Sequence, residues 1–254
     1  MMRALLLALC FSLAARAQTM ADQEQRLIEV HSLLVALPPT NAPGAYRRGE
    51  LSLGLEIITI PTINGQTGGT RQITASDRTP AFPRLRAAVG LPAPADFRAS
   101  VGVAYIPPIP INDVSSHFGA LDAEFAYAPG PLAVGLRGHL LAARSMSPVT
   151  DPNTRDTLDT VEFGINAAAG YRFDFEPGSV TPYLGVGVTR VNGFFHVTSD
   201  GTDLSSHTTN PGFTAGLRLF ARQHFEGVVE LVVFPGRLIH PSFRLAWVPD
   251  WLAR

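Results

Sequence analysis

From Tyr46 onward, apolar and polar residues alternate with a period of two along most of the chain. Successive side chains of an extended strand point to opposite faces, so this period predicts β-strands. Each alternating segment is bounded by Gly, Pro, Asn or Asp, which favour turns. Ten such segments are placed near residues 50–60, 81–91, 96–106, 116–128, 131–143, 159–173, 180–197, 212–222, 224–234 and 238–248.

No second long helical pattern accompanies these segments, so no layer of helices is available to cover a sheet. The strands must therefore pack as a sandwich of two sheets or close into a barrel. In nearly every segment one face carries the charged side chains and the other face carries none. Within 159–173, for example, Val161 and Phe163 lie on the face opposite Glu162 and Asn166. A soluble sandwich shows the same alternation, so the period alone leaves both architectures open.

The lengths of the connections favour a membrane barrel. Long connections at 61–80, 107–115, 144–158 and 198–211 alternate with connections of about two to seven residues, although 235–237 is short where a long one is expected. A barrel with both chain ends in the periplasm has long external loops and tight periplasmic turns in this order. We therefore expect a closed antiparallel up-and-down transmembrane β-barrel of about ten strands, with eight as the alternative.

Aromatic residues support the barrel over a soluble β-domain. In the orientation just described, seven of them fall on the apolar face at the periplasmic ends of their strands. Aromatic rings favour the headgroup level of a bilayer, whereas a soluble core has no reason to collect them at one edge. The predicted periplasmic girdle consists of Phe97, Phe125, Tyr127, Tyr171, Phe173, Phe225 and Trp247.

The same assignment turns the charged face toward the enclosed lumen. Long side chains largely fill a barrel of this size, so we expect the inward charges to form ion pairs with one another. A narrow pore with a mild preference for anions is the alternative. The predicted lumenal network consists of Arg84, Arg86, Arg98, Asp122, Glu124, Arg137, Glu162, Arg172, Arg218, Arg222, Glu226, Glu230 and Arg244, and Glu56 faces the same way.

The chain begins with a predicted signal peptide, residues 1–17, in which a basic start precedes an apolar run and small residues flank the cleavage point after Ala17. Lipoprotein cleavage at Cys10, the only cysteine, is the weaker alternative. Residues 18–45 are predicted to form a periplasmic amphipathic helix over 19–37 and a linker, and 46–254 the barrel domain. The apolar stripe of the helix packs against the domain, makes a periplasmic contact or plugs the barrel mouth.

One strand also carries a family resemblance. The stretch Val180–Val188, with its proline, tyrosine, leucine and paired glycines, resembles a strand that recurs in small outer-membrane β-barrel proteins of Gram-negative bacteria. The resemblance implies export to the outer membrane, with outer-membrane lipid and the assembly machinery as partners. Such proteins commonly end on an aromatic residue that the machinery recognises, whereas this chain continues past Trp247. The recognition signal is then internal, at Trp247, or involves Trp251, or insertion itself is in question.

Composition excludes several other functions. The net charge of −1 and the 16% of charged residues give no nucleic-acid footprint. No cofactor motif is present, and the loop carboxylates at 151–156 and 200–203 lie in ordinary turn sequences, so no metal site is expected. Ser115, Ser116, His117 and Asp122 lie close in sequence but form no recognised catalytic pattern. We therefore expect a structural or interaction role, with a small-solute pore as the first alternative and a lipid-modifying hydrolase as the second.

Overall fold

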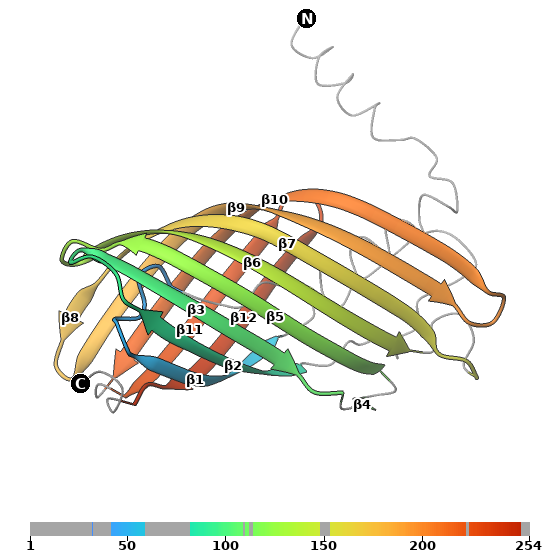
Figure 1. Cartoon of the computed structure of the whole chain (residues 1–254), viewed down its shortest axis with the longest axis horizontal. Helices are drawn as coiled ribbons and strands as arrows, with labels where there is room; N and C mark the ends of the chain where they lie inside the picture. The colour runs from blue at the N-terminus through green and yellow to red at the C-terminus, as the bar shows by residue number, and fades with distance from the viewer. Residues whose placement is uncertain are drawn as a thin grey trace, which may run out of the picture.

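The chain forms a closed antiparallel β-barrel in a computed structural model that describes residues 32, 42–58, 82–108, 110–111, 114–147, 153–221 and 224–249 (Figure 1). Twelve strands lie within these residues: β1 (Leu51–Ile58), β2 (Phe82–Leu91), β3 (Phe97–Ile106), β4 (Pro110–Ile111), β5 (Val114–Tyr127), β6 (Leu132–Ser147), β7 (Asp156–Tyr171), β8 (Phe173–Phe175), β9 (Gly178–Val197), β10 (Thr202–Ala221), β11 (Phe225–Phe234) and β12 (Leu238–Trp247).

Ten of the twelve strands make the barrel wall. Each wall strand pairs with its neighbours along the chain, and antiparallel pairing of β1 with β12 closes the ring. The two short strands, β4 and β8, are paired with β5 and β9 alone within the described part of the chain. The predicted ten-stranded antiparallel barrel is confirmed, and the alternative of eight strands is wrong.

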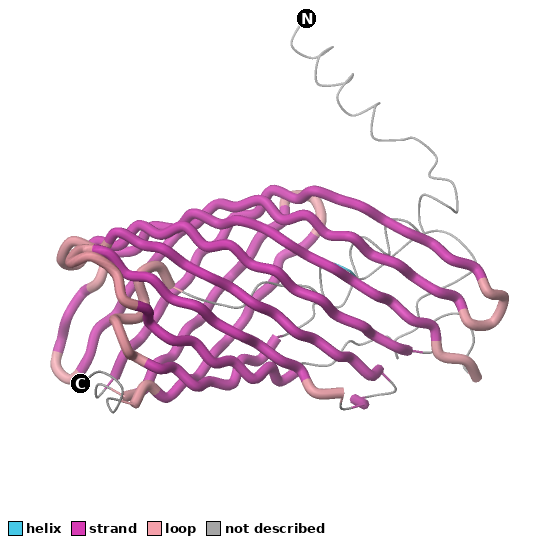
Figure 2. Tube along the Cα trace, in the orientation of Figure 1, coloured by secondary structure: helices cyan, strands magenta, loops and turns pink. Residues whose placement is uncertain are grey.

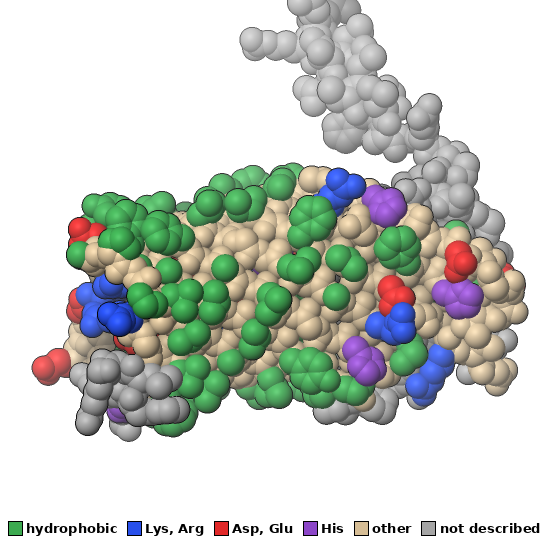
Figure 3. All heavy atoms as spheres, viewed as in Figure 1, with side chains coloured by type: hydrophobic (Ala, Val, Ile, Leu, Met, Phe, Trp, Pro, Cys, Tyr) green, Lys and Arg blue, Asp and Glu red, His purple; other side chains and the backbone are tan. Residues whose placement is uncertain are grey.

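The two faces of the wall have opposite character. On β5, Leu121 faces outward and is 57% exposed, whereas the adjacent Asp122 faces inward and is 6% exposed. The same alternation runs along the other wall strands, so apolar side chains form a belt on the outer surface (Figure 3). A soluble sandwich would bury its apolar face, and that alternative is therefore excluded. An apolar exterior around a polar interior is the arrangement of a barrel in lipid.

The two ends of the barrel differ, and we name them by their connections. At the turn end, on the left of Figure 1, short connections join β2 to β3, β5 to β6 and β10 to β11. At the loop end lie the connections from β1 to β2, β3 to β5, β6 to β7, β9 to β10 and β11 to β12. No helix among the described residues is long and apolar enough to span a membrane.

The wall is taller on one side than on the other (Figure 2). Five consecutive wall strands, β5, β6, β7, β9 and β10, have 14 to 20 residues, whereas β1, β2, β3, β11 and β12 have 8 to 10. The prediction of a loop over 198–211 is wrong, because β10 begins at Thr202 and the turn covers only 198–201. The polar run from Ser205 to Asn210 interrupts the apolar alternation by which the strand was predicted. It nevertheless continues β10 beyond the apolar belt, where both faces of the strand can carry polar side chains.

Two predicted segments cannot be compared with the structure. The signal peptide (1–17) and, apart from Ser32, the amphipathic helix (19–37) lie outside the described residues. Arg222 and the segment after Pro249, including Trp251, lie outside them as well.

Candidate lumenal site

A short piece of chain before β1 lies inside the barrel, and we call residues 42–46 the lumenal segment. Ala42 and Tyr46 are each 1% exposed, and Ala42 packs against Tyr183 and Val228 on the inner wall. Hydrogen bonds from Gly49 N to Gly90 O and from Gly90 N to Glu50 O fix the following residues at the turn end. The lumenal segment therefore connects to β1 at the turn end of the barrel.

Tyr46 is the main polar contact of the lumenal segment. Its hydroxyl donates to Glu226 Oε2 at 3.1 Å and accepts a hydrogen bond from Arg244 Nη2 at 3.1 Å. Burial raises the pKa of the Tyr46 phenol, so the hydroxyl keeps the proton that it donates. A second contact comes from the backbone, since Gly44 N donates to Glu124 Oε1. Two inward carboxylates thus hold the lumenal segment.

Glu226 is the centre of the largest charged cluster. Its Oε1 accepts hydrogen bonds from Arg218 Nε at 2.6 Å and from Arg244 Nη2 at 2.9 Å, while Ser52 Oγ donates to its Oε2 at 3.3 Å. The Glu226 side chain is fully buried. A buried carboxylate is tolerated only where ion pairs and hydrogen bonds compensate for lost hydration, and Glu226 has both.

Four smaller groups occupy other parts of the inner wall. Asp122 forms an ion pair with Arg86 at 2.9 Å and lies 3.8 Å from Arg137. Glu56 accepts from Arg84 Nε at 3.1 Å. The other two groups are His139 Nε2 with Glu162 Oε1, at 2.9 Å, and Tyr183 Oη with Glu230 Oε2, at 2.7 Å. All nine of these side chains come from wall strands, so the strand register determines which of them meet.

Most of the residues predicted for the lumenal network lie in these groups, and three do not. Arg98 is partly exposed, and its guanidinium donates to Phe97 O. Arg172 pairs with Asp174 at 3.0 Å at the turn end, because β7 stops at Tyr171 and leaves Arg172 at the rim. Arg222 is outside the described residues.

Sequence reasoning missed two participants of the lumenal site. The sequence pattern places Tyr46 at the start of the barrel domain, and a segment of only five residues is too short to show a period that would place it in the lumen. Tyr183 is an aromatic on the polar face of its strand, opposite Gly216. A Cβ on Gly216 would lie 2.1 Å from Tyr183 Cζ, so the glycine makes room for the ring. An inward aromatic facing a glycine was the signal that could have identified Tyr183.

The seven aromatic residues of the predicted girdle lie on the outer surface near the turn end. Phe97 stacks on Phe125 with ring centroids 5.1 Å apart and contacts Tyr127 at 5.2 Å, and Tyr171 contacts Phe173 at 4.9 Å. Phe225 and Trp247 are opposite each other in the pairing of β11 with β12.

The residues considered for a hydrolase do not converge. His117 is exposed on the outer face, whereas Asp122 faces inward and pairs with Arg86. Ser116 is hydrogen-bonded to Ser145 at 2.7 Å. The hydrolase alternative is therefore not supported. Within the described residues, no group of three or more His, Cys, Asp or Glu side chains could hold a metal ion.

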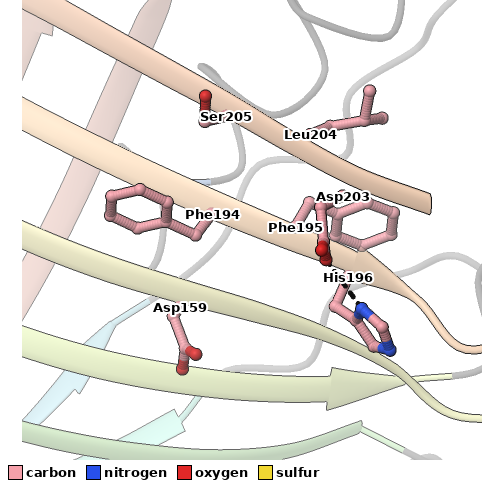
Figure 4. Close-up of a pocket in the computed structure, with 7 residues that line it drawn as sticks. All are labelled: Asp159, Phe194, Phe195, His196, Asp203, Leu204 and Ser205. Carbon is pink, nitrogen blue, oxygen red and sulfur yellow. Dashed lines mark hydrogen bonds and ion pairs between the residues drawn. The ribbon is translucent and has the colours of Figure 1, made fainter. Parts of the chain in front are cut away.

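A small pocket of about 390 Å³ lies at the loop end, on the part of β7, β9 and β10 beyond the belt (Figure 4). Asp159, Phe194 and Ser205 line it, and His196 Nδ1 lies 2.7 Å from Asp203 Oδ1. Arg144 Nε, from β6, donates to Asp159 Oδ1 at 2.6 Å. The charged groups beside this pocket are therefore paired with each other.

No protein-family model and no curated protein sequence matches the chain. Among solved structures, the translocator domain of autotransporter NalP from Neisseria meningitidis is similar with a TM-score of 0.50 and 10% identity, over 90% of this chain and 95% of that chain. The beta domain of the Bordetella autotransporter BrkA has a TM-score of 0.39 and 12% identity, over 80% of this chain and 99% of that chain. The N-terminal beta-barrel domain of Pseudomonas aeruginosa OprF has a TM-score of 0.30 and 9% identity, over 80% of this chain and 98% of that chain. At 10% identity the likeness to the NalP translocator domain shows the fold alone, which is that of a Gram-negative outer-membrane β-barrel.

Proposed function

We propose that this chain is an exported outer-membrane β-barrel with a structural or interaction role, whose lumen is closed near the turn end. We further propose that the turn end faces the periplasm and the loop end faces the cell exterior. The fold and the apolar outer belt support the location in a membrane. Three of the five connections at the loop end, 59–81, 107–113 and 148–155, are longer than those at the turn end, and this supports the orientation.

The observation that carries the closed lumen is the set of contacts around the lumenal segment. Tyr46 and Gly44 bind Glu226 and Glu124, which stand on different parts of the wall, on β11 and β5. The segment therefore bridges the lumen, and inward ion pairs surround it. Ion pairing between these buried charges reduces their need for water or mobile ions in this part of the lumen.

Conductance in a planar bilayer tests this proposal. The purified full chain is expected to insert without producing conductance steps, and the same preparation is expected to show a heat-dependent shift in electrophoretic mobility, the mark of a folded barrel. Regular conductance steps from the unmodified protein, obtained with such folded material, would contradict the closed lumen.

A narrow pore for a small solute is the second candidate, and the way the lumenal segment is held favours it. The segment belongs to no strand, and a few side-chain contacts keep it in the lumen. Its withdrawal would open a passage lined by guanidinium groups. Tyr46→Ala then produces conductance steps with anion preference, whereas Tyr127→Ala, on the outer surface, does not. A silent Tyr46→Ala barrel would remove the support for a pore controlled by this segment.

A further inference from the structure

Arg190 differs from the other charged residues on the outer surface of the tall side. It points outward from β9, and no described residue forms an ion pair with it. The outward-facing Arg144, by contrast, is paired with Asp159. In the strand register, Arg190 lies between Phe163 on β7 and Thr209 on β10. An exposed cation at this place lacks an anionic partner from its own chain.

Directly toward the turn end from Arg190, the outer surface becomes apolar. The next outward row contains Ile165 and Val188, which are 49% and 43% exposed. Toward the loop end, the next row contains Asn192 and His207, whose side chains are hydrogen-bonded at 2.9 Å. Arg190 therefore lies where the outer surface changes from an apolar row to rows that mix polar side chains with the exposed Val161 and Phe194.

A shallow apolar groove of about 510 Å³ crosses the belt below Arg190. Small side chains, Ala167, Ala169 and Ala215, form its floor, and larger ones, among them Leu184 and Phe213, form its sides. The groove spans strands β6 to β11, so it is long enough to follow an extended hydrocarbon chain. Among its lining residues, Val186 shares the outer face of β9 with Arg190.

The spacing of Arg190 and the nearest part of the groove fits within one leaflet of a bilayer. Val186 and Arg190 are four residues apart on β9, a distance of about 13 Å along a strand. The hydrocarbon of one leaflet is about 15 Å deep. With Arg190 at the headgroup level of the outer leaflet, the part of the groove at Val186 and Phe213 lies within the acyl chains of that same leaflet, and the groove continues toward Val134, which is paired with Tyr127 near the turn end.

We propose that Arg190 and this groove form a binding site for a phosphorylated glycolipid of the outer leaflet. The Arg190 guanidinium pairs with a lipid phosphate, which supplies the missing anion in a charge-assisted hydrogen bond. One acyl chain lies in the groove, and Asn192 and His207 provide hydrogen-bonding groups for sugar hydroxyls. The site rests on the proposed membrane location and orientation, and it does not depend on whether the lumen is closed.

Retention of purified lipid A by the full-length protein in a nonionic detergent tests the site, with native mass spectrometry counting bound lipid. The unmodified protein is expected to retain one lipid A. Arg190→Ala is expected to weaken retention about fivefold, the effect of one interfacial charge of about 1 kcal/mol. Arg190→Lys keeps the positive charge, so it is expected to retain more lipid A than Arg190→Ala and less than the unmodified protein. The double variant Ala167→Leu with Ala215→Leu, which fills the groove, also lowers retention, and Arg48→Ala, at the turn end, changes nothing.

Equal retention by Arg190→Ala and the unmodified protein overturns the proposal, and so does unchanged retention when the groove is filled. Phosphatidylglycerol bound as tightly as lipid A overturns the assignment to a glycolipid. Competition by inorganic phosphate alone at equal concentration shows a simple anion site and overturns the role of the groove. Each variant is first checked for the heat-dependent mobility shift, so that loss of the fold is not read as loss of the site. A conducting barrel contradicts the proposed closed lumen but leaves the lipid result intact.

Discussion

Single side chains divide in this barrel into those that meet lipid and those that meet each other. Glu226 illustrates the second kind, because one carboxylate joins two guanidiniums, a serine and the Tyr46 hydroxyl. Removing a charge from such a cluster leaves its buried partners uncompensated. Breaking a buried ion pair in this way is strongly destabilising, by about 3–5 kcal/mol.

Glu226→Gln is therefore expected to lower the free energy of unfolding by about 3–5 kcal/mol, because Arg218 and Arg244 both lose their anion. Urea unfolding from lipid vesicles measures the loss. Glu176→Gln, an exposed residue in the turn after β8, is the matched control and should unfold like the unmodified protein. Equal stability of the two variants would contradict a central role for Glu226.

Leu217→Arg tests whether the outward-facing side chains meet lipid. Leu217 faces outward on β10 and is 39% exposed. Arginine at the hydrocarbon midplane costs about 2–4 kcal/mol in a barrel of this type. We expect poorer insertion into vesicles and a matching loss of stability, whereas Leu217→Met should be nearly neutral. Normal assembly of the arginine variant would place this face outside the hydrocarbon.

At the scale of elements, alternation in the sequence locates strands well wherever one face is uniformly apolar. The ends of β1, β2, β3, β11 and β12 agree with the predicted segments within about two residues. The tall strands were predicted too short, because residues such as Ser205, His207 and Thr209 face outward beyond the belt and break the pattern. Ion-pair partners are harder to predict than strand positions, because they depend on the register between strands, which the pattern of a single strand does not encode.

The connection from the lumenal segment to β1 makes its own prediction. Gly90 is hydrogen-bonded to Gly49 and Glu50, and a Cβ at Gly90 would lie 1.8 Å from Arg47 O. Gly90→Ala must displace this connection and loosen the hold on Tyr46. Trypsin, which cleaves after arginine, should then cut at Arg47 or Arg48 faster than in the unmodified protein.

Gly138→Ala is the control for that experiment, because the nearest atom to its Cβ would be Gly164 O at 4.0 Å. Its cleavage rate should equal that of the unmodified protein. If Gly90→Ala also resists trypsin as the unmodified protein does, the connection is not anchored where the hydrogen bonds place it.

For the whole molecule, everything depends on closure between the first and last wall strands. Leu55 on β1 is paired with Leu245 on β12, and both side chains face outward, 44% and 58% exposed. A closed ring leaves no long free edge for aggregation, which an open sheet of this size would present. The sequence predicted this closure only indirectly, through the absence of helices to cover a sheet.

Cysteines at Leu55 and Leu245 test the closure, because the chain has one native cysteine, Cys10, within the predicted signal peptide. Side chains opposite each other on paired strands have Cβ atoms about 5 Å apart, so a short bismaleimide should link the pair. The link gives a changed mobility in denaturing electrophoresis. Cysteines at Leu55 and Leu217, on strands that are not neighbours, should remain unlinked, and similar linking of both pairs would argue against the ring.

The unequal lengths of the wall strands make one side of the barrel taller than the other. In the proposed orientation, β6, β7, β9 and β10 rise above the membrane on one side, while β11, β12 and β1 end close to the lipid. A large particle that approaches from outside the cell meets the protruding parts of these four strands on one side, whereas the described strands of the other side end at the rim. A partner that must touch the short side therefore has to approach from a restricted range of directions. Whether a given encounter succeeds then depends on how the barrel is rotated about the membrane normal.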